Sequence, residues 1–318
     1  MTSLARALIE DDDTLLPSRR DEDWRWTDLR GALRVLPKPA HATVSEKRET
    51  GRLERSFKFV QARGYHGQFA LEVPAGEHLV LIDRFLGAEA AYAADLSLTF
   101  TLGEGASLTR IAFHRDSAEA VTVTTAEVSL APGARYAQTV LAAGAKRQRI
   151  ETRLVHPGGG AVARLDGAYV LAGQRHSDQT TEVRHQGRNG ECRELVKGVV
   201  ADQARGVFQG RIVVAHGADG TDAKLGHHAL VLSDKAEVDS KPELEIYADD
   251  VACAHGNTVG ALNEEALFYA RARGIPPLEA KRMLTEAFLA EVVERVEDPA
   301  ARDLAASWLA ERLMGVAG

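Results

Sequence analysis

Cysteine is scarce in this chain, which has two cysteines, Cys192 and Cys253, among 318 residues. A pair so far apart makes no disulfide framework, so we expect a reducing compartment. Near the start, the acidic run 10–13 stands where a signal peptide would need an apolar core. No apolar run approaches the roughly 18 residues of a membrane span. We therefore predict a cytoplasmic protein.

Nucleotide-binding and hydrolase signatures are missing as well. The sequence has no glycine-lysine pair, which excludes a Walker A loop, and its glycine turns lie between strands instead of opening helices. The motifs G-x-S-x-G, H-E-x-x-H and C-x-x-C do not occur, which removes the common hydrolase, metalloprotease and thiol-redox signatures. We expect that this chain binds no nucleotide itself. A net charge of -7 offers no overall attraction to nucleic acid or to an anionic membrane.

Residues 57–262 are predicted to be a mainly β domain. Short alternating runs such as 96–100 and 121–124 are separated by turns that contain glycine. Five turns recur at intervals of about 26 to 30 residues, a period that suits stacked coils. They begin at Gly103, Ala131, Gly158, Gly187 and Gly217. A β-sandwich gives similar strand and turn spacing, so the two folds compete at this point.

The N-terminal residues 1–56 are predicted to be a helical region followed by a linker. Leu4, Leu8 and their neighbours recur at helical spacing. The stretch 17–33 has tryptophans and leucines that could dock short helical turns on a larger body. The charged stretch Ser45–Arg55 lacks periodicity and is predicted to be an exposed linker.

The C-terminal residues 263–318 are predicted to form three helices. Asn263 is a plausible N-cap for the first, which stops at Gly274. Two prolines open the second helix, whose stripe of Leu284, Phe288, Val292 and Val296 continues until an Asp-Pro pair breaks it. The third helix carries Leu304, Trp308, Leu309 and Leu313 on one side. These stripes could pack against the β domain or form a groove for a partner, and periodicity does not separate the two.

The segment KPELEIYADDVACAHGNTVG, residues 241–260, carries the most suggestive chemistry. Side chains at i and i+2 of a strand share a face, so Asp249, Val251, Cys253 and His255 are predicted to line one surface. Thiolate and imidazole together suit iron, copper or zinc, yet two ligands fall short of the four of a closed site. A metal site here would be shared or transient. The alternative is a small buried cysteine beside a hydrogen-bonded surface histidine.

Other polar residues have a weaker claim to function. His227 and His228 are adjacent, so in a strand they face opposite ways and are expected to be core or surface histidines, not paired ligands. Cys192 is expected at an interior strand position. The acidic pairs 243/245 and 249/250 could act as catalytic acids, but charged strand rims are commoner.

Several segments of the chain resemble a known family. RELVKGVVADQARGVFQGRI (193–212) and the block D-D-V-x-C-x-H-G around Cys253 closely resemble the SufB/SufD family of SUF iron–sulfur cluster assembly proteins, and favour its SufD branch. The N-terminal pattern of Pro17, Glu22, Trp24 and Thr27 is similar to that of SufD. The stretch AHGADGTDAKLGHH (215–228) departs from the family pattern.

The resemblance implies a right-handed parallel β-helix flanked by helical regions, which would settle the choice between solenoid and sandwich. It implies a non-catalytic subunit of a scaffold complex that supports iron acquisition and cluster assembly. Such a subunit pairs with SufB through the β-helix end and binds the SufC ATPase through its C-terminal helices. Cys253 and His255 match residues that would hold iron or a nascent cluster together with SufB. Reduced flavin in the complex, and a homodimer of the isolated chain, are further expectations.

Two other functions compete with this interpretation. A β-helix enzyme acting on polysaccharide would use paired carboxylates in a groove midway along the solenoid. In this chain the acids instead gather near Cys253, in the last predicted coil. The second alternative is a purely structural partner, in which Cys253 and His255 only pack at an interface. Iron incorporation by the co-expressed complex would distinguish that alternative from the metal site.

Overall fold

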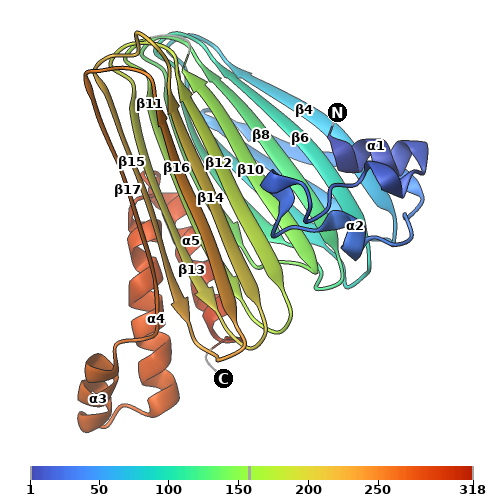
Figure 1. The fold of residues 1–318 in the computed structure, drawn as a ribbon, viewed down its shortest axis with the longest axis vertical. Helices are drawn as coiled ribbons and strands as arrows, with labels where there is room; N and C mark the ends of the chain where they lie inside the picture. Colours follow the sequence, from blue (N-terminus) through green and yellow to red (C-terminus); the bar gives the residue numbers. More distant parts are fainter. Residues whose placement is uncertain (1, 157–158, 317–318) are drawn as a thin grey trace.

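The chain forms a flattened β-solenoid with short helices on one side and three longer helices on the other (Figure 1). This computed structural model describes residues 2–156 and 159–316. Sheet A contains, in spatial order, β1 (Pro39–His41), β4 (Gly64–Val73), β6 (Ala93–Leu102), β8 (Val121–Leu130), β10 (Arg147–His156), β12 (His176–His185), β14 (Arg205–Val214) and β16 (Glu237–Ile246). Sheet B contains β17 (Val251–Gly260), β15 (Thr221–Val231), β13 (Glu191–Val200), β11 (Val162–Leu171), β9 (Arg135–Ala142), β7 (Ser107–Arg115), β5 (His78–Gly87), β3 (Arg52–Phe59) and β2 (Val44–Glu49).

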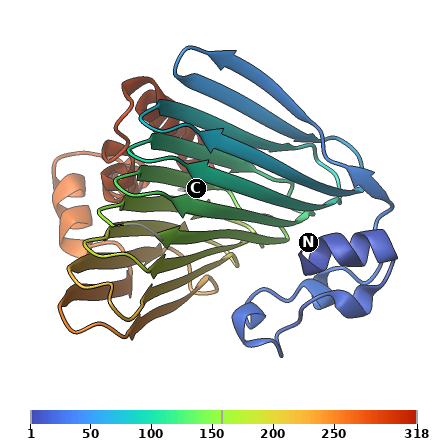
Figure 2. The same cartoon turned by 90° about the horizontal axis from the view of Figure 1, so that it is seen from above.

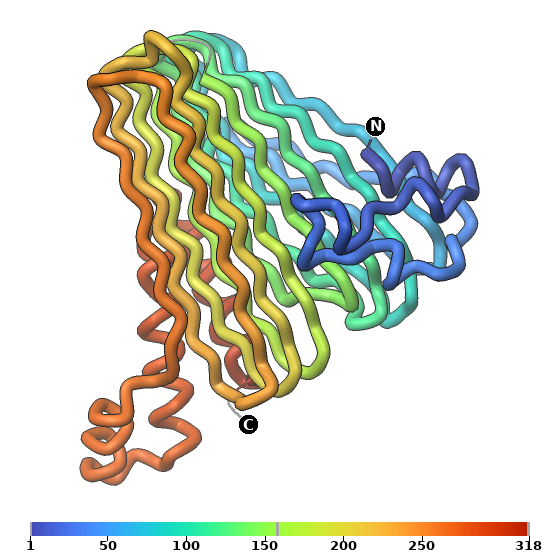
Figure 3. Tube along the Cα trace, in the orientation of Figure 1, coloured from blue at the N-terminus to red at the C-terminus, as the bar shows by residue number. Residues whose placement is uncertain are grey.

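The strands alternate between the two sheets from β4 to β17, so each coil of the chain adds one strand to each sheet. Figure 3 follows these coils as they stack in sequence order. Neighbouring strands within each sheet run parallel, and β2 and β3 are the antiparallel pair. A sandwich is built from antiparallel sheets. The predicted parallel solenoid is therefore confirmed.

The recurring turns stack on one another along one edge of the solenoid. The backbone N–H of Gly105 donates to the carbonyl of Pro132 at 3.1 Å, and that of Gly133 donates to Gly159 at 3.1 Å. Both donor glycines have a left-handed backbone, with φ of 65° and 67°, which side chains disfavour. The repeat in the sequence thus reflects a repeated turn geometry. Part of the turn predicted at Gly158 lies outside the described residues.

The stretch Ser45–Arg55 was predicted to be a linker, and this is wrong. It forms most of the hairpin β2–β3, whose second strand begins the solenoid. Arg55 hid the strand pattern because it points into the core, where its Nε lies 2.7 Å from Oδ1 of Asp83. Arg110 shares the same carboxylate at 2.8 Å. All three side chains are buried, so the ion pairs replace their hydration.

The N-terminal region packs on the outer face of sheet A, as Figure 2 shows from above. It contains α1 (Ser3–Glu10), η1 (Asp13–Leu15), η2 (Glu22–Trp24) and α2 (Leu29–Ala32). Leu4, Leu8 and Leu29 form one buried cluster with Val121 and Val123 of β8. The predicted docking of short helical turns on a larger body is confirmed.

The C-terminal helices are α3 (Glu264–Ala272), α4 (Pro277–Glu294) and α5 (Pro299–Leu313). The side chain of Asn263 accepts a hydrogen bond from the N–H of Ala266 at 3.0 Å, as the predicted N-cap requires. Helices α4 and α5 cover the outer face of sheet B, whereas α3 and the start of α4 extend past the solenoid (Figure 1). None of the described helices has the length and apolar character needed to cross a membrane.

Candidate metal half-site at the open end of the solenoid

The last coil of the solenoid ends in two unpaired strand edges. Strand β16 is the outer strand of sheet A and β17 is the outer strand of sheet B. Beneath them the apolar interior is only partly covered, because Ile246 is 41% exposed and Val259 is 47% exposed. An open edge of this kind exposes backbone donors and acceptors and is usually covered by another element or chain.

Cys253 and His255 lie on β17 at this end and share one face of the strand. Cys253 pairs with Ala223 of β15 and His255 pairs with Leu225, two positions that face the solenoid interior. The predicted juxtaposition of the two side chains on one face therefore follows from the strand. Cys253 is partly buried against the core and His255 is exposed.

Asp249 does not belong to this face, and the prediction that it does was wrong. Strand β17 begins at Val251, and the two aspartates before it form a bend. The cause is the stacking of turns, because the N–H of Gly220 in the preceding turn donates to the carbonyl of Asp250 at 2.7 Å. The strand pattern was extended too far toward the N-terminus.

The environment of Cys253 favours the neutral thiol. Burial raises the pKa of its thiol, and the nearby carboxylate of Asp222 raises it further. A thiol of raised pKa is a poor nucleophile and binds metal only with loss of its proton. Metal binding at Cys253 would therefore require a cation, or a change of surroundings, that lowers this pKa.

Cys253 and His255 supply half of the ligands that a closed metal site needs. Among residues 2–156 and 159–316 there is no group of three or more His, Cys, Asp or Glu side chains arranged to hold a metal ion. Cys253 and His255 supply two ligands, and four are usual for a closed site with thiolate and imidazole. The remaining ligands would have to come from another chain or a small molecule.

The other histidines of this region have structural partners. His227 points inward, where its Nε2 lies 2.9 Å from the hydroxyl of Tyr169 and its Nδ1 lies 2.9 Å from Oδ1 of Asn257. His228 points outward, with Nδ1 2.7 Å from Oγ1 of Thr258. The prediction that these two histidines face opposite ways is confirmed.

Cys192 occupies the interior strand position predicted for it. Its Sγ lies 3.8 Å from Oε1 of Glu194, and burial raises the pKa of the thiol well above its usual value. Burial also raises the pKa of Glu194 to about 7, and the hydroxyl of Thr181 donates to its carboxyl group at 2.7 Å. This thiol is fully buried, so we read it as part of the core.

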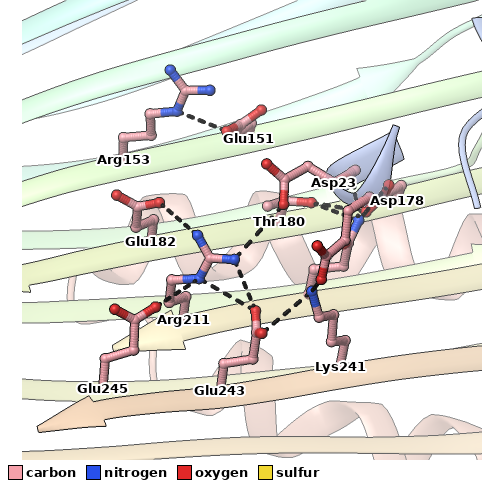
Figure 4. A network of polar contacts seen from close by, with 12 residues as sticks. Asp23, Glu151, Arg153, Asp178, Thr180, Glu182, Arg211, Lys241, Glu243 and Glu245 are labelled. Carbon is pink, nitrogen blue, oxygen red and sulfur yellow. Dashed lines mark hydrogen bonds and ion pairs between the residues drawn. The ribbon is translucent and has the colours of Figure 1, made fainter. Parts of the chain in front are cut away.

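The acids of β16 belong to a charged row on the outer face of sheet A. The strands bring five residues of alternating charge into one row that ends at the open edge: Glu127, Arg153, Glu182, Arg211 and Glu243. In Figure 4, Arg211 lies among Glu182, Glu243 and Glu245, at 3.6, 3.0 and 3.5 Å. Sequence reasoning missed this row, which becomes visible only when the coils are aligned. The carboxylates of Glu182, Glu243 and Glu245 are held in ion pairs with Arg211, which argues against a catalytic role.

A group of exposed apolar residues lies on α3 and the start of α4, apart from Leu304 and Met314 of the α5 region. Four large side chains here are 45% to 73% exposed: Phe268, Tyr269, Leu278 and Met283. We call them the helical arm surface. The apolar stripe predicted for the second C-terminal helix packs on sheet B instead. Its Val292 and Val296 are buried there, and its Leu284 and Phe288 are half-buried.

Comparisons with known proteins agree with this architecture. Residues 58–288 match the family described as SUF system FeS cluster assembly, SufBD core domain. The chain is 32% identical over 195 residues to an iron–sulfur cluster assembly SufBD family protein of Synechocystis, a match covering 61% of this chain and 43% of the relative. It is 41% identical over 138 residues to the iron–sulfur cluster assembly protein SufD of Escherichia coli, covering 43% and 33%. It is 37% identical over 127 residues to SufD of Bacillus subtilis, covering 40% and 29%. The chain thus spans less than half the length of these relatives.

Proposed function

This chain belongs to the SufBD family of SUF iron–sulfur cluster assembly proteins, and from that premise we propose that it is a SufD-type, non-catalytic subunit of a scaffold complex. In this proposal it supports iron acquisition and cluster assembly in the cytoplasm. Iron or a nascent cluster is the cargo. The observation that carries the proposal is the pair Cys253 and His255, two side chains of metal-binding type that share one face of the last strand at the open end of the solenoid.

SufB is the proposed partner at this end, and its strands would cover the edges of β16 and β17. A partner that adds a strand beside β16 continues the charged row beyond Glu243, and alternation calls for a lysine or arginine at that position. The same partner would complete the metal site with its own ligands. Without SufB, the open end would pair with a second copy of itself by two-fold symmetry.

SufC is the proposed partner of the helical arm surface. Phe268 and Tyr269 are 73% and 61% exposed on a helix that extends past the solenoid, which suits a protein contact. A chain that lacks a Walker A loop would rely on such an ATPase for nucleotide hydrolysis. A reduced flavin, if the complex uses one, would bind where several chains contribute.

Truncation after Gly260 is a poor test of SufC binding. Removing α4 and α5 would expose Ile82, Ile111, Phe113, Leu141 and Leu195 on sheet B, and the solenoid would lose solubility. Surface substitutions on α3 leave that packing in place.

The proposed function is tested by co-expression with SufB-type and SufC-type partners followed by anaerobic purification. We expect all three chains to co-purify and the complex to carry iron and sulfide. In Cys253→Ser the complex should still form, with a partial loss of iron. A complex that forms normally and keeps normal iron in both the Cys253→Ser and the His255→Ala variants would mean that this chain is a structural partner without a metal role.

A further inference from the structure

A second pair of histidines lies inside the solenoid, in the coils that precede the last one. His156 ends β10 and His185 ends β12, and the two residues are direct neighbours in the parallel register. Both side chains are 0% exposed. Their ring centroids are 4.5 Å apart, and the ring planes are inclined by 44°.

The four ring nitrogens of this pair have no hydrogen-bond partner among the described residues. Buried polar atoms without partners are rare in folded proteins and call for an explanation. His227 and His176 show the contrast, whereas Nε2 of the buried His114 also lacks a partner among the described residues. His227 is bonded at both nitrogens, and Nε2 of His176 lies 2.9 Å from the carbonyl oxygen of Trp26. A partner that the described residues do not supply would satisfy His156 and His185.

A neutral imidazole has one nitrogen with a free lone pair, and this is the form that binds metal. In that form each of the two neighbouring rings offers one ligand nitrogen.

Gly190 lies directly against both rings. A Cβ atom placed on Gly190 would lie 2.6 Å from Nδ1 of His185 and 3.4 Å from Nδ1 of His156. Both Nδ1 atoms thus lie close to one backbone position, and a side chain at 190 would collide with the ring of His185. The backbone of Gly190 is outside the left-handed region, so alanine is sterically, not conformationally, disfavoured there.

We propose that His156 and His185 form a buried binding site for a monovalent, soft metal ion, of which cuprous copper is the representative. Imidazole is a good ligand for copper, and the described residues place no third His, Cys, Asp or Glu with this pair. Zinc usually takes four ligands and would be left short. A single positive charge also costs less to bury than a double charge.

The test is anaerobic titration with cuprous ion, supplied as its acetonitrile complex, in competition with a coloured chelator. The protein carries Cys253→Ser, so that this thiol does not contribute. We expect one equivalent of copper, a rise in melting temperature on binding, and a copper X-ray absorption spectrum with nitrogen and no sulfur ligands. Zinc ion is the control metal and should bind at least tenfold more weakly.

Two kinds of variant separate a metal site from unsatisfied core histidines. The variant Gly190→Ala keeps both imidazoles but places a methyl group against their Nδ1 atoms. It should abolish binding of the one equivalent of copper. The control variant Gly260→Ala places a methyl group in open space and should bind as wild type. The double variant His156→Leu/His185→Leu should also lose the copper. Absence of the equivalent in the parent protein, its persistence in Gly190→Ala, or sulfur ligation would each overturn the proposal.

Discussion

The open edge of β16 can be tested with a single proline, because alternate residues of this strand send their N–H groups to opposite sides. Toward the neighbouring strand β14, which we call the inward side, the N–H of Glu237 donates to the carbonyl of Ala204 at 3.0 Å and that of Tyr247 donates to the carbonyl of Val214 at 2.9 Å. Odd-numbered residues therefore serve the chain's own ladder and even-numbered residues face the open edge. The native Pro242 obeys this rule, since its missing donor falls on the open side.

We predict that Ile246→Pro weakens association while leaving the fold intact. It removes one outward donor, worth about 0.5–1.5 kcal/mol, and its ring also obstructs a strand added from outside. The dissociation constant should rise about tenfold, since about 1.4 kcal/mol corresponds to that factor. The effect on the free energy of unfolding should stay within about 1 kcal/mol, because the side chain is 41% exposed.

The matched control is Glu245→Pro at the adjacent position. It removes the N–H of residue 245, which faces the neighbouring strand β14. It should lower the free energy of unfolding by about 1–3 kcal/mol, because a ladder hydrogen bond is lost, and Glu245→Ala corrects for the lost carboxylate. Sedimentation or light scattering gives the association constants, for the homodimer and for the complex with SufB, and calorimetry gives stability. The reasoning fails if Ile246→Pro associates like wild type. A monomeric wild-type chain at micromolar concentrations would refute the self-pairing alone.

Three further predictions concern pH, the buried ions and the helical arm surface. Burial lowers the pKa of several histidines, so the free energy of unfolding should fall as pH drops below about 6.5, by up to about 2 kcal/mol per histidine at pH 5; urea titrations across this range check it. These histidines are His114 and His156 (about 3) and His185 and His227 (about 4). Asp83→Asn should cost about 3–5 kcal/mol by calorimetry, because two buried guanidinium groups lose their counterion; a loss below 1 kcal/mol would contradict this. Phe268→Ser should weaken SufC capture without lowering the melting temperature, whereas unchanged capture would exclude this surface.

The acidic groups oppose part of the pH effect and leave its sign unchanged. Burial raises the pKa of the carboxyl groups of Asp95, Asp166 and Glu194 to about 6, 6 and 7. Their folded-state protons stabilise the protein as pH falls toward 4. Between pH 6.5 and 5 the destabilising effect of the four histidines, whose pKa values are shifted further, outweighs the stabilising effect of the three acids. A stability that rose over this interval would show that the histidines are hydrated in solution.

The coil length and the shared face of Cys253 and His255 could be predicted because both depend on short-range rules, whereas the choice of a solenoid over a sandwich rested on the family resemblance. The turn period gives the coil length, and strand alternation puts Cys253 and His255 on one face. Features that require the register between coils could not be predicted. The charged row that ends at Glu243 and the pair His156 and His185 each join residues that are distant in sequence. Aligning the repeats turn by turn would have revealed both.

Two errors have different origins. Asp249 was placed by extending the strand alternation past the start of β17, whereas Arg55 was assigned to an exposed linker by its charge although it points inward. In a solenoid the position within the coil decides the environment, and a buried charge is tolerated where a neighbouring coil supplies its counterion. Sequence patterns that count charges as exposed fail at such positions.

The central claim is that His255 is a metal ligand at the junction with SufB. Its most direct test is the iron and sulfide content of the co-expressed complex, purified anaerobically, with His255→Ala compared against wild type and His228→Ala. His228 lies on the neighbouring strand, faces outward, and is bonded to Thr258 at 2.7 Å, so it controls for loss of an imidazole. We predict that all three complexes assemble and melt alike, and that only His255→Ala loses most of its iron and sulfide. Wild-type iron and sulfide in His255→Ala would contradict the claim.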